Sequence, residues 1–281
     1  MGVSHLFTFS LFHPFTLKEP FHLYNMQYKQ KDRKQYFNEL SATSKKFFLP
    51  YIERFLPIEK GMNVLEIGCG DGGNLLPIAE RGCNVVGVDM AECRINDAKR
   101  FFEEQGTEGT FIASDVFAIK EFEHHFDLII CHDVIEHIMD KALFLHKVRK
   151  FLRPQGIIFM SFPAWQMPFG GHQQICRSKL LSHLPWFHLL PAAIYGRILR
   201  AFGENAGITA ELLEIKQTRC PIELFERLAN EHFTIRNRTL FFINPHYETK
   251  FGLRPRLLWS SLGRVRHVRN FFTTSCFYIL E

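Results

Sequence analysis

Glycines and carboxylates gather at the ends of short apolar runs in the first half of the chain. The run over residues 63–67 contains Glu66 and leads into residues 68–73, where four of six positions are glycine. Glycine reaches positive backbone φ without strain and lets a ligand approach the main chain closely. An acid beside such a loop can face a cationic or hydroxyl-bearing ligand. The pattern predicts a site for a nucleotide-like cofactor at the end of a strand.

The glycine spacing alone leaves the identity of that cofactor open. Gly68, Gly70 and Gly73 satisfy the G-x-G-x-x-G pattern of dinucleotide-binding chains. In those chains the position of Glu66 normally carries an apolar residue. A carboxylate there favours a cationic ligand instead, and S-adenosylmethionine carries both an ammonium and a sulfonium group. Glu66 therefore moves the interpretation toward S-adenosylmethionine.

Two more carboxylates follow the next two apolar runs. Asp89 ends residues 84–89, about 20 residues past the glycines, where a carboxylate accepts hydrogen bonds from ribose hydroxyls. Asp115 follows residues 110–113, and an acid at that place can accept a hydrogen bond from the amino group of adenine. Val116, next in the chain, would lie beside the adenine ring.

The order of these motifs resembles that of a known family. The chain carries in sequence VLEIGCGDGG, VVGVDM, SDV, FDLIICHDVIEHI and FLRPQGIIF. Over about residues 45–162 this set is similar to class I S-adenosylmethionine-dependent methyltransferases, notably the branch with the ubiquinone and menaquinone biosynthesis enzymes. The resemblance implies that Gly68 and Gly70 line the methionine moiety, Asp89 the ribose and Asp115 the adenine. The residues predicted to bind the cofactor are Glu66, Gly68, Cys69, Gly70, Gly72, Asp89, Met90, Asp115, Val116 and His132.

Alternating strands and helices set the predicted fold class. Five β-rich runs fall at residues 63–67, 84–88, 110–113, 126–131 and 156–162. Helical patterns lie between them at residues 75–81, 91–105 and 141–151. Such alternation is typical of an α/β fold with a doubly wound parallel sheet. The resemblance implies a Rossmann-like, seven-stranded sheet in the order 3-2-1-4-5-7-6, with a terminal antiparallel strand over residues 273–280 and a helical cap insertion.

The second half of the chain departs from this alternation. Residues 163–220 carry four prolines, three of which open or bound apolar helical stretches. We expect a helical cap there, at the substrate side of the cofactor-binding core over residues 28–162. Residues 221–281 would complete the core sheet, with a basic insertion at 244–270.

The N-terminus and the cysteines bear on the compartment. Residues 1–27 lack a basic start and a small-residue cleavage site, so they are predicted to be a disordered tail or a mis-called start, with Met26 as the true first residue. No apolar run reaches the roughly 18 residues of a membrane-spanning helix. Seven cysteines without a C-x-x-C pair indicate reduced thiols. These features predict a cytoplasmic protein.

A polar stretch follows the fourth predicted strand. If residues 132–137 were helical, His132 would share a face with Glu136, and Asp133 with His137. A divalent-metal site is one interpretation, because some related quinone-pathway enzymes use an acid-rich form of this stretch with such an ion. Hydrogen bonding to the backbone of the pocket is the other. The spacing matches no recognised ligand motif, so no metal is predicted.

His172 is the predicted catalytic residue. It follows the fifth strand, directly after Gly170 and Gly171. The glycine pair permits a tight turn that would aim the imidazole into the pocket, where a histidine can act as general base toward a hydroxyl acceptor. The alternative is a histidine that caps a helix or bonds the loop.

The C-terminal part concentrates positive charge. Residues 249–280 contain no Asp or Glu but six basic residues, Lys250, Arg254, Arg256, Arg264, Arg266 and Arg269. They could meet an anionic acceptor or a membrane surface, or they could form the solvated face of a helix.

Taken together, the motifs predict an S-adenosylmethionine-dependent methyltransferase that acts on a small molecule, an aromatic or lipid-like acceptor with an anionic group. The alternative is an RNA methyltransferase that uses the basic C-terminal segment. The sequence shows no appended RNA-binding module, so nucleic acid is not the expected partner. A binding protein that keeps the fold without the chemistry is a third hypothesis, and the intact glycine loop with Asp89 and Asp115 argues against it.

Overall fold

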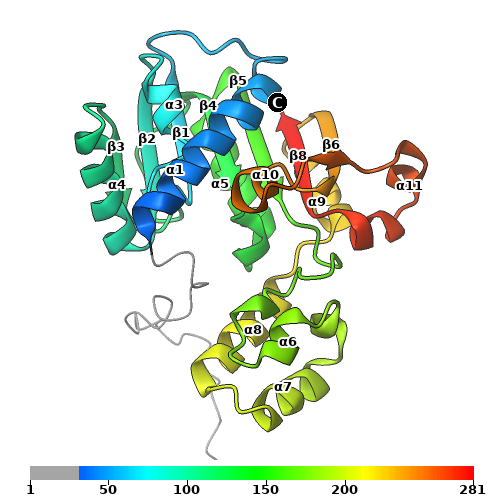
Figure 1. Ribbon diagram of the computed structural model, residues 1–281. Helices are drawn as coiled ribbons and strands as arrows, with labels where there is room; N and C mark the ends of the chain where they lie inside the picture. Colours follow the sequence, from blue (N-terminus) through cyan, green and yellow to red (C-terminus); the bar gives the residue numbers. More distant parts are fainter. Residues whose placement is uncertain (1–31) are drawn as a thin grey trace, which may run out of the picture.

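A mixed, eight-stranded sheet forms the centre of the molecule (Figure 1). The computed structural model describes residues 32–281, so the predicted tail over residues 1–27 lies outside the described residues. The strands are, in chain order, β1 Asn63–Ile67, β2 Asn84–Asp89, β3 Thr110–Ala113, β4 Phe126–His132, β5 Leu152–Phe162, β6 Ile235–Ile243, β7 Arg256–Leu257 and β8 Ser275–Leu280. Across the sheet they follow the order β3-β2-β1-β4-β5-β8-β6-β7.

The predicted α/β fold and strand order are confirmed, with one addition. Strands β1 to β5 run parallel. Strand β8 lies antiparallel between β5 and β6, as the resemblance implied for the terminal strand. The prediction of seven strands is wrong by one, because β7 pairs with the outer edge of β6. Two residues are too few to show an alternating pattern in a sequence.

Helices cover both faces of the sheet. In chain order, the α-helices of the described residues are α1 Arg33–Thr43, α2 Leu49–Ile52, α3 Leu76–Ala79, α4 Glu92–Glu104, α5 Lys141–Phe151, α6 Lys179–His183, α7 Ala192–Ala201, α8 Ala206–Thr218, α9 Ile222–Ala229, α10 His246–Phe251 and α11 Ser260–Arg264. Apolar side chains of α5 and α9 form one core with the sheet, and those of α1 to α4 form the other. Leu65 belongs to the first core and Val64 to the second, because successive strand residues point to opposite faces.

A separate helical lobe follows β5. Helices α6, α7 and α8 pack around a small core of their own that includes Phe187, Tyr195 and Leu212. Helix α7 begins after Pro191, and Gly203 with φ of +77° follows its end, a pairing of proline and glycine that suits helix termini. Figure 1 shows this lobe below the sheet, where two connecting segments of the chain join it to the sheet. It lies within the region predicted as a helical cap.

Helix α1 packs directly on the loop that joins β1 to α3. A β-carbon on Gly73 would lie 2.5 Å from the carbonyl oxygen of Phe37 in α1. Just beyond α1, the Ser44 hydroxyl donates to the carbonyl oxygen of Asn74 at 2.8 Å. The helix and the loop therefore form one packed unit, and only glycine fits at their closest contact.

Gly73→Ala is expected to destabilise the protein. Overpacking of a close contact typically costs about 1–3 kcal/mol, which corresponds to a melting temperature roughly 2–10 °C lower. Gly196→Ala in α7 is the matched control, since its nearest neighbour is an ordinary 3.5 Å away and alanine suits a helix interior better than glycine. That control should melt at or above the wild-type temperature. Equal melting temperatures for both variants would contradict the tight contact at Gly73.

Candidate functional site

The glycine loop lies where the strand order reverses, between β1 and β4. Gly68 has φ of +70°, and a β-carbon there would lie 2.3 Å from Cγ2 of Val134. Gly70 and Gly72 also have positive φ, +52° and +83°. Because larger residues are strained in this conformation, the loop presents main chain rather than side chains at the carboxyl ends of the strands.

Asp89 fixes the glycine loop to the end of β2. Its Oδ2 atom accepts the backbone N–H of Gly70, and its Oδ1 atom accepts that of Ala91, each at 2.9 Å. A carboxylate has about four acceptor sites, so two remain for ligand hydroxyls. Asp89, which was predicted to bind the ribose, therefore also holds the backbone of the glycine loop in place. Its position in the sequence did not reveal this second role.

Glu66 is buried beneath the same loop and only partly hydrogen-bonded. Its side chain is 1% exposed. Oε1 accepts the amide of Asn74 at 2.7 Å, while Oε2 has no hydrogen-bond partner among residues 32–281. Burial raises the pKa of Glu66 to about 8, although the bond from Asn74 opposes the shift. A buried carboxyl with an unpartnered oxygen suits a cationic ligand group.

Glu66→Gln is expected to flatten the dependence of stability on pH. The folded pKa lies above the ordinary value of 4.5, so the ligand-free wild type loses stability as the pH rises from 4.5 through about 8. Glutamine is neutral throughout, so the variant should gain on the order of 2 kcal/mol over the wild type across that window. Denaturant unfolding at several pH values measures this difference. A wild-type curve that stays flat over the window would show that Glu66 is ionised in the folded protein.

The remaining predicted cofactor residues differ in their exposure. Asp115 is exposed, and its Oδ1 atom accepts the N–H of Phe117 at 2.9 Å. Val116 is buried beside it, whereas Met90 after β2 is 71% exposed. Cys69 is buried in the core, with its sulfur beside Gly87 in β2 and 3.6 Å from the carbonyl oxygen of Gly70.

Asp71 is a loop residue that the sequence reasoning missed. Its carboxylate is fully buried and accepts the guanidinium of Arg33 in α1 at 3.2 Å. Arg94 in α4 lies 3.7 Å from the same oxygen. Burial raises the pKa of Asp71, while the two guanidinium groups oppose the shift. This ion-pair network holds α1 and α4 against the glycine loop, and the acid within the GCGDGG motif was its only sequence signal.

The stretch after β4 is not an α-helix. Strand β4 runs to His132, and only residues Ile135–His137 form a short 3-10 turn. Asp133, with φ of +53°, bends the chain between them. The helical faces considered for His132 and Glu136, and for Asp133 and His137, therefore do not form. His132 instead packs its ring 4.9 Å from that of Phe48 and lies 3.6 Å from the Asp133 carboxylate.

Glu136, His137 and His172 come together from two loops. One possible ligand atom from each lies within 4.8 Å of the others, so the trio could hold a small divalent cation or share a proton. The Glu136 carboxylate is 6% exposed, and neither oxygen has a hydrogen-bond partner in the described chain. Burial raises the pKa of Glu136 well above its ordinary value, and the charge of Asp133 adds to the shift.

The loop after β5 brings His172 to this cluster. Its imidazole lies edge-on to that of His137, with ring centres 5.0 Å apart. His172 itself has φ of +57°, an uncommon conformation for a non-glycine residue. The two glycines before it serve close packing, because β-carbons on them would lie 2.2 Å from the Trp165 carbonyl and 2.1 Å from His188. Burial lowers the pKa of His172, which keeps the imidazole neutral and able to accept a proton.

Tyr36 is a further titratable residue of α1, the helix that packs on the glycine loop. Burial raises its pKa to about 12, the guanidinium of Arg94 opposes the shift, and the charges of Asp133, Asp71 and Glu66 add to it. Nothing in the local sequence of α1 marked it.

Comparison with known proteins identifies the family. A family model described as "Methyltransferase domain" matches residues 58–206, which include the glycine loop, Asp89, Asp115 and His172. This chain belongs to the methyltransferase-domain family. The resemblance of the motifs to class I S-adenosylmethionine-dependent methyltransferases is thereby confirmed.

Relatives of this methyltransferase match it over part of its length. The ubiquinone biosynthesis O-methyltransferase of Bartonella tribocorum is 32% identical over 121 residues, which cover 41% of this chain and 49% of that protein. The chain thus spans about half the length of the curated relatives it matches. Two solved structures share the fold over nearly the whole chain. A putative sarcosine dimethylglycine methyltransferase from Galdieria sulphuraria has a TM-score of 0.54 at 12% identity, covering 90% of each chain. The plantazolicin methyltransferase BpumL, in complex with S-adenosylhomocysteine, has a TM-score of 0.52 at 15% identity, covering 90% of this chain and 86% of its own.

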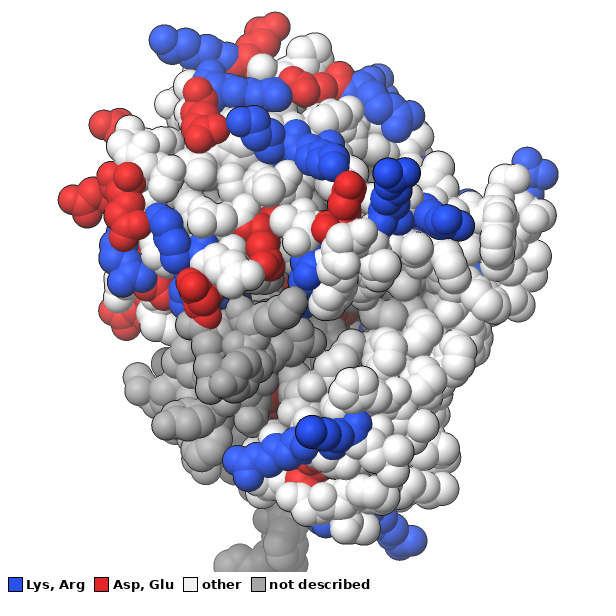
Figure 2. All heavy atoms as spheres, viewed as in Figure 1, with Lys and Arg blue, Asp and Glu red and all other residues white. Residues whose placement is uncertain are grey.

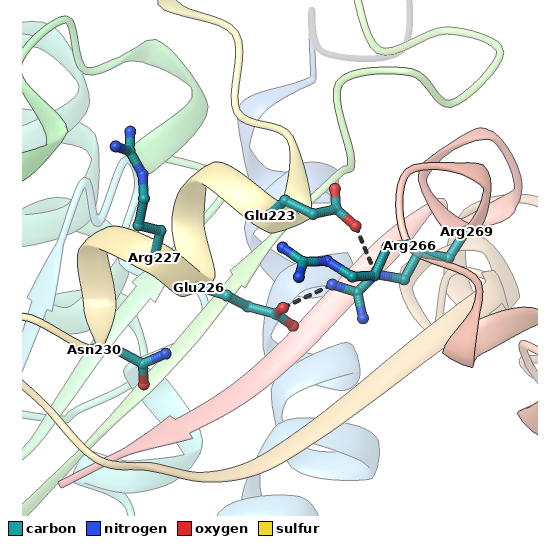
Figure 3. Close-up of a pocket in the computed structure, with 6 residues that line it drawn as sticks. All are labelled: Glu223, Glu226, Arg227, Asn230, Arg266 and Arg269. Atoms are coloured by element: carbon teal, nitrogen blue, oxygen red, sulfur yellow. Dashed lines mark hydrogen bonds and ion pairs between the residues drawn. The ribbon is translucent and has the colours of Figure 1, made fainter.

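A surface cavity of about 310 Å³ lies beside α9, outside the residues that the family model matches (Figure 3). Arg269 closes it, with Nε 3.0 Å from Glu223 and Nη2 2.6 Å from Glu226. Figure 3 shows both carboxylates turned toward Arg269. Arg269 is buried, so the placement of this residue on an exposed basic face is wrong, because its charge is neutralised inside the fold. We regard this network as a structural link between α9 and the C-terminal segment.

Proposed function

We propose that this protein is an S-adenosylmethionine-dependent methyltransferase that methylates a hydroxyl group of a small molecule. The buried carboxyl of Glu66, with one oxygen unpartnered beneath the glycine loop, carries the proposal. A dinucleotide offers no ammonium group to such a carboxyl, whereas S-adenosylmethionine does. The location at the reversal of strand order supports the same interpretation.

The residues around the glycine loop would each bind a different part of the cofactor. S-adenosylmethionine, when bound, supplies a methyl group activated by its positively charged sulfur. The glycine loop brings bare backbone to the methionine end, and Asp89 accepts the ribose hydroxyls with its two remaining acceptor sites. Asp115 and Val116 stand at the adenine end. Glu66 loses its proton as it meets the ammonium, because a nearby positive charge stabilises the carboxylate.

The cluster of Glu136, His137 and His172 is suited to binding and deprotonating the methyl acceptor. His172, neutral through burial, would accept the proton of the acceptor hydroxyl while the hydroxyl oxygen takes the methyl group and the carbon–sulfur bond of the cofactor breaks, which would leave S-adenosylhomocysteine. The unpartnered carboxyl of Glu136 lies beside His137, and this pair can stabilise the imidazolium that results. Positioning of the acceptor and exclusion of water supply much of the remaining rate enhancement, up to about 7–11 kcal/mol.

The hydroxyl acceptor is supported by the name of the Bartonella relative, an O-methyltransferase. An RNA acceptor, the alternative from the sequence, would rely on the basic C-terminal segment. Strand β7, within that segment, stands five positions from β1 in the sheet, which is about 24 Å at the usual strand spacing of roughly 4.8 Å. That separation favours a small acceptor bound near His172.

Calorimetric titration with S-adenosylmethionine tests the proposal. Binding should release protons near pH 7, seen as a heat that changes with the ionisation enthalpy of the buffer, and Glu66→Gln should abolish that difference. Catechol is then added as a probe acceptor, and released S-adenosylhomocysteine is measured. Tight binding of NADH together with no binding of S-adenosylmethionine would overturn the assignment.

A further inference from the structure

Residues 251–268, which we call the edge segment, are exposed to an unusual degree for an apolar stretch. They follow α10, pair briefly with β6 through β7, and continue into α11 at the outer edge of the sheet (Figure 1). Leu257 is 61% exposed and Trp259 68%. Leu258 between them is buried, so the two exposed side chains share the outward face of an extended stretch. Phe251, Leu253 and Val265 add between 47% and 53% exposure each.

The edge segment also carries positive charge that no acidic residue within it balances. Arg254, Arg256, Arg264 and Arg266 are all exposed. No carboxylate of residues 32–281 forms an ion pair with these four, and residues 249–280 contain no acid at all. Figure 2 shows the right-hand edge of the molecule, where Figure 1 places α11, as mostly white, with blue residues at its margin and no red residue on the face in view.

Large apolar groups ringed by arginine have a specific physical use. An apolar patch on a soluble surface generally marks an interaction site. Tryptophan and leucine enter the boundary between headgroups and acyl chains, while arginine attracts anionic headgroups. The ring of Trp259 stacks on that of Phe242, with ring centres 5.9 Å apart, and this contact fixes the position of the exposed indole. RNA would use the arginines but has no need of exposed leucine and valine.

We propose that the edge segment docks this protein on an anionic lipid bilayer. The surface lies far from the glycine loop along the sheet, so docking does not depend on the proposed methyl transfer. It places the protein at the surface where an acceptor with a lipid-like body would be held. None of the helices in residues 32–281 has the length and hydrophobicity to cross a bilayer.

Co-sedimentation of the full chain with vesicles tests the proposal. Vesicles of phosphatidylcholine with about 30% phosphatidylglycerol should bind the protein, and pure phosphatidylcholine should bind it at least about tenfold more weakly. The charge variant Arg256→Glu with Arg264→Glu should weaken binding about 10- to 100-fold. Leu257→Ser should weaken it about tenfold through lost apolar contact. Trp259 emission should shift to shorter wavelength on binding, and Trp259→Phe should remove that shift.

Matched controls lie in the helical lobe. Leu180 in α6 is 61% exposed, the same as Leu257, so Leu180→Ser should bind vesicles like the wild type. The double variant Arg197→Glu with Arg200→Glu in α7 controls for the same change of net charge, because both arginines are exposed. Melting temperatures of all variants establish that they fold. Equal binding to both kinds of vesicle, or equal losses in the edge-segment and lobe variants, would overturn the proposal. Salt-sensitive binding to a single-stranded RNA with no binding to vesicles would do the same in favour of a nucleic-acid surface.

Discussion

Replacement of Asp89 by alanine is expected to weaken the binding of S-adenosylmethionine about 100-fold. The carboxylate now has two tasks, since it fixes the backbone of Gly70 and Ala91 and is expected to accept the ribose hydroxyls. Hydrogen bonds to a charged group contribute roughly 1.5–3 kcal/mol each, and 1.4 kcal/mol is a factor of ten in affinity. The fold should survive, because Asp89 is only half-buried and belongs to neither apolar core.

Calorimetric titration of three variants separates the two tasks. Asp89→Asn keeps one acceptor oxygen and should lose less affinity than Asp89→Ala. Glu103→Ala is the control, since Glu103 is an exposed carboxylate on α4. It should bind the cofactor like the wild type. Unchanged affinity in Asp89→Ala would count against the whole cofactor assignment rather than against this residue alone.

The fold could be predicted because its signals are local. The runs over Asn63–Ile67 and Asn84–Asp89 are short, mostly apolar stretches of the kind that a buried parallel strand requires. Helix α5 occupies the predicted residues Lys141–Phe151, with Asp140 capping its first turn through a 2.9 Å bond to Leu143. The family resemblance supplied the order of the last strands, which no local pattern contains.

The parts of the site that were missed depend on contacts between distant segments. Arg33 reaches the glycine loop only because α1 folds back on it, and the sequence of α1 gives no sign of that packing. The residues after β4 have the sequence spacing of a helix, but Asp133 adopts a left-handed backbone conformation that prevents an α-helix from forming there. Arg269 looked exposed within a basic run, yet two carboxylates of α9 neutralise it. In each case tertiary contacts overrode a local pattern.

His172→Asn should lower kcat about 10²–10⁴-fold while leaving the affinity for S-adenosylmethionine nearly unchanged. Asparagine tolerates the left-handed backbone of His172 better than alanine, so the imidazole is removed with little added strain. Burial lowers the pKa of His172 below its ordinary value of 6.5. The base is active when neutral, so wild-type activity should fall only as the pH drops through that lowered pKa. The variant should lack this acid limb.

His267→Asn is the control for the backbone, because His267 has φ of +64° and a largely exposed side chain remote from the cluster. Its kcat and pH profile should match the wild type. A His172→Asn enzyme with normal kcat and a raised KM would show that the imidazole only binds the acceptor. The neighbouring Glu136 and His137 allow one further distinction. If a chelator removes wild-type activity and Mg²⁺ restores it, the trio acts through a bound cation, and the loss in the variant then reports a missing ligand rather than a missing base.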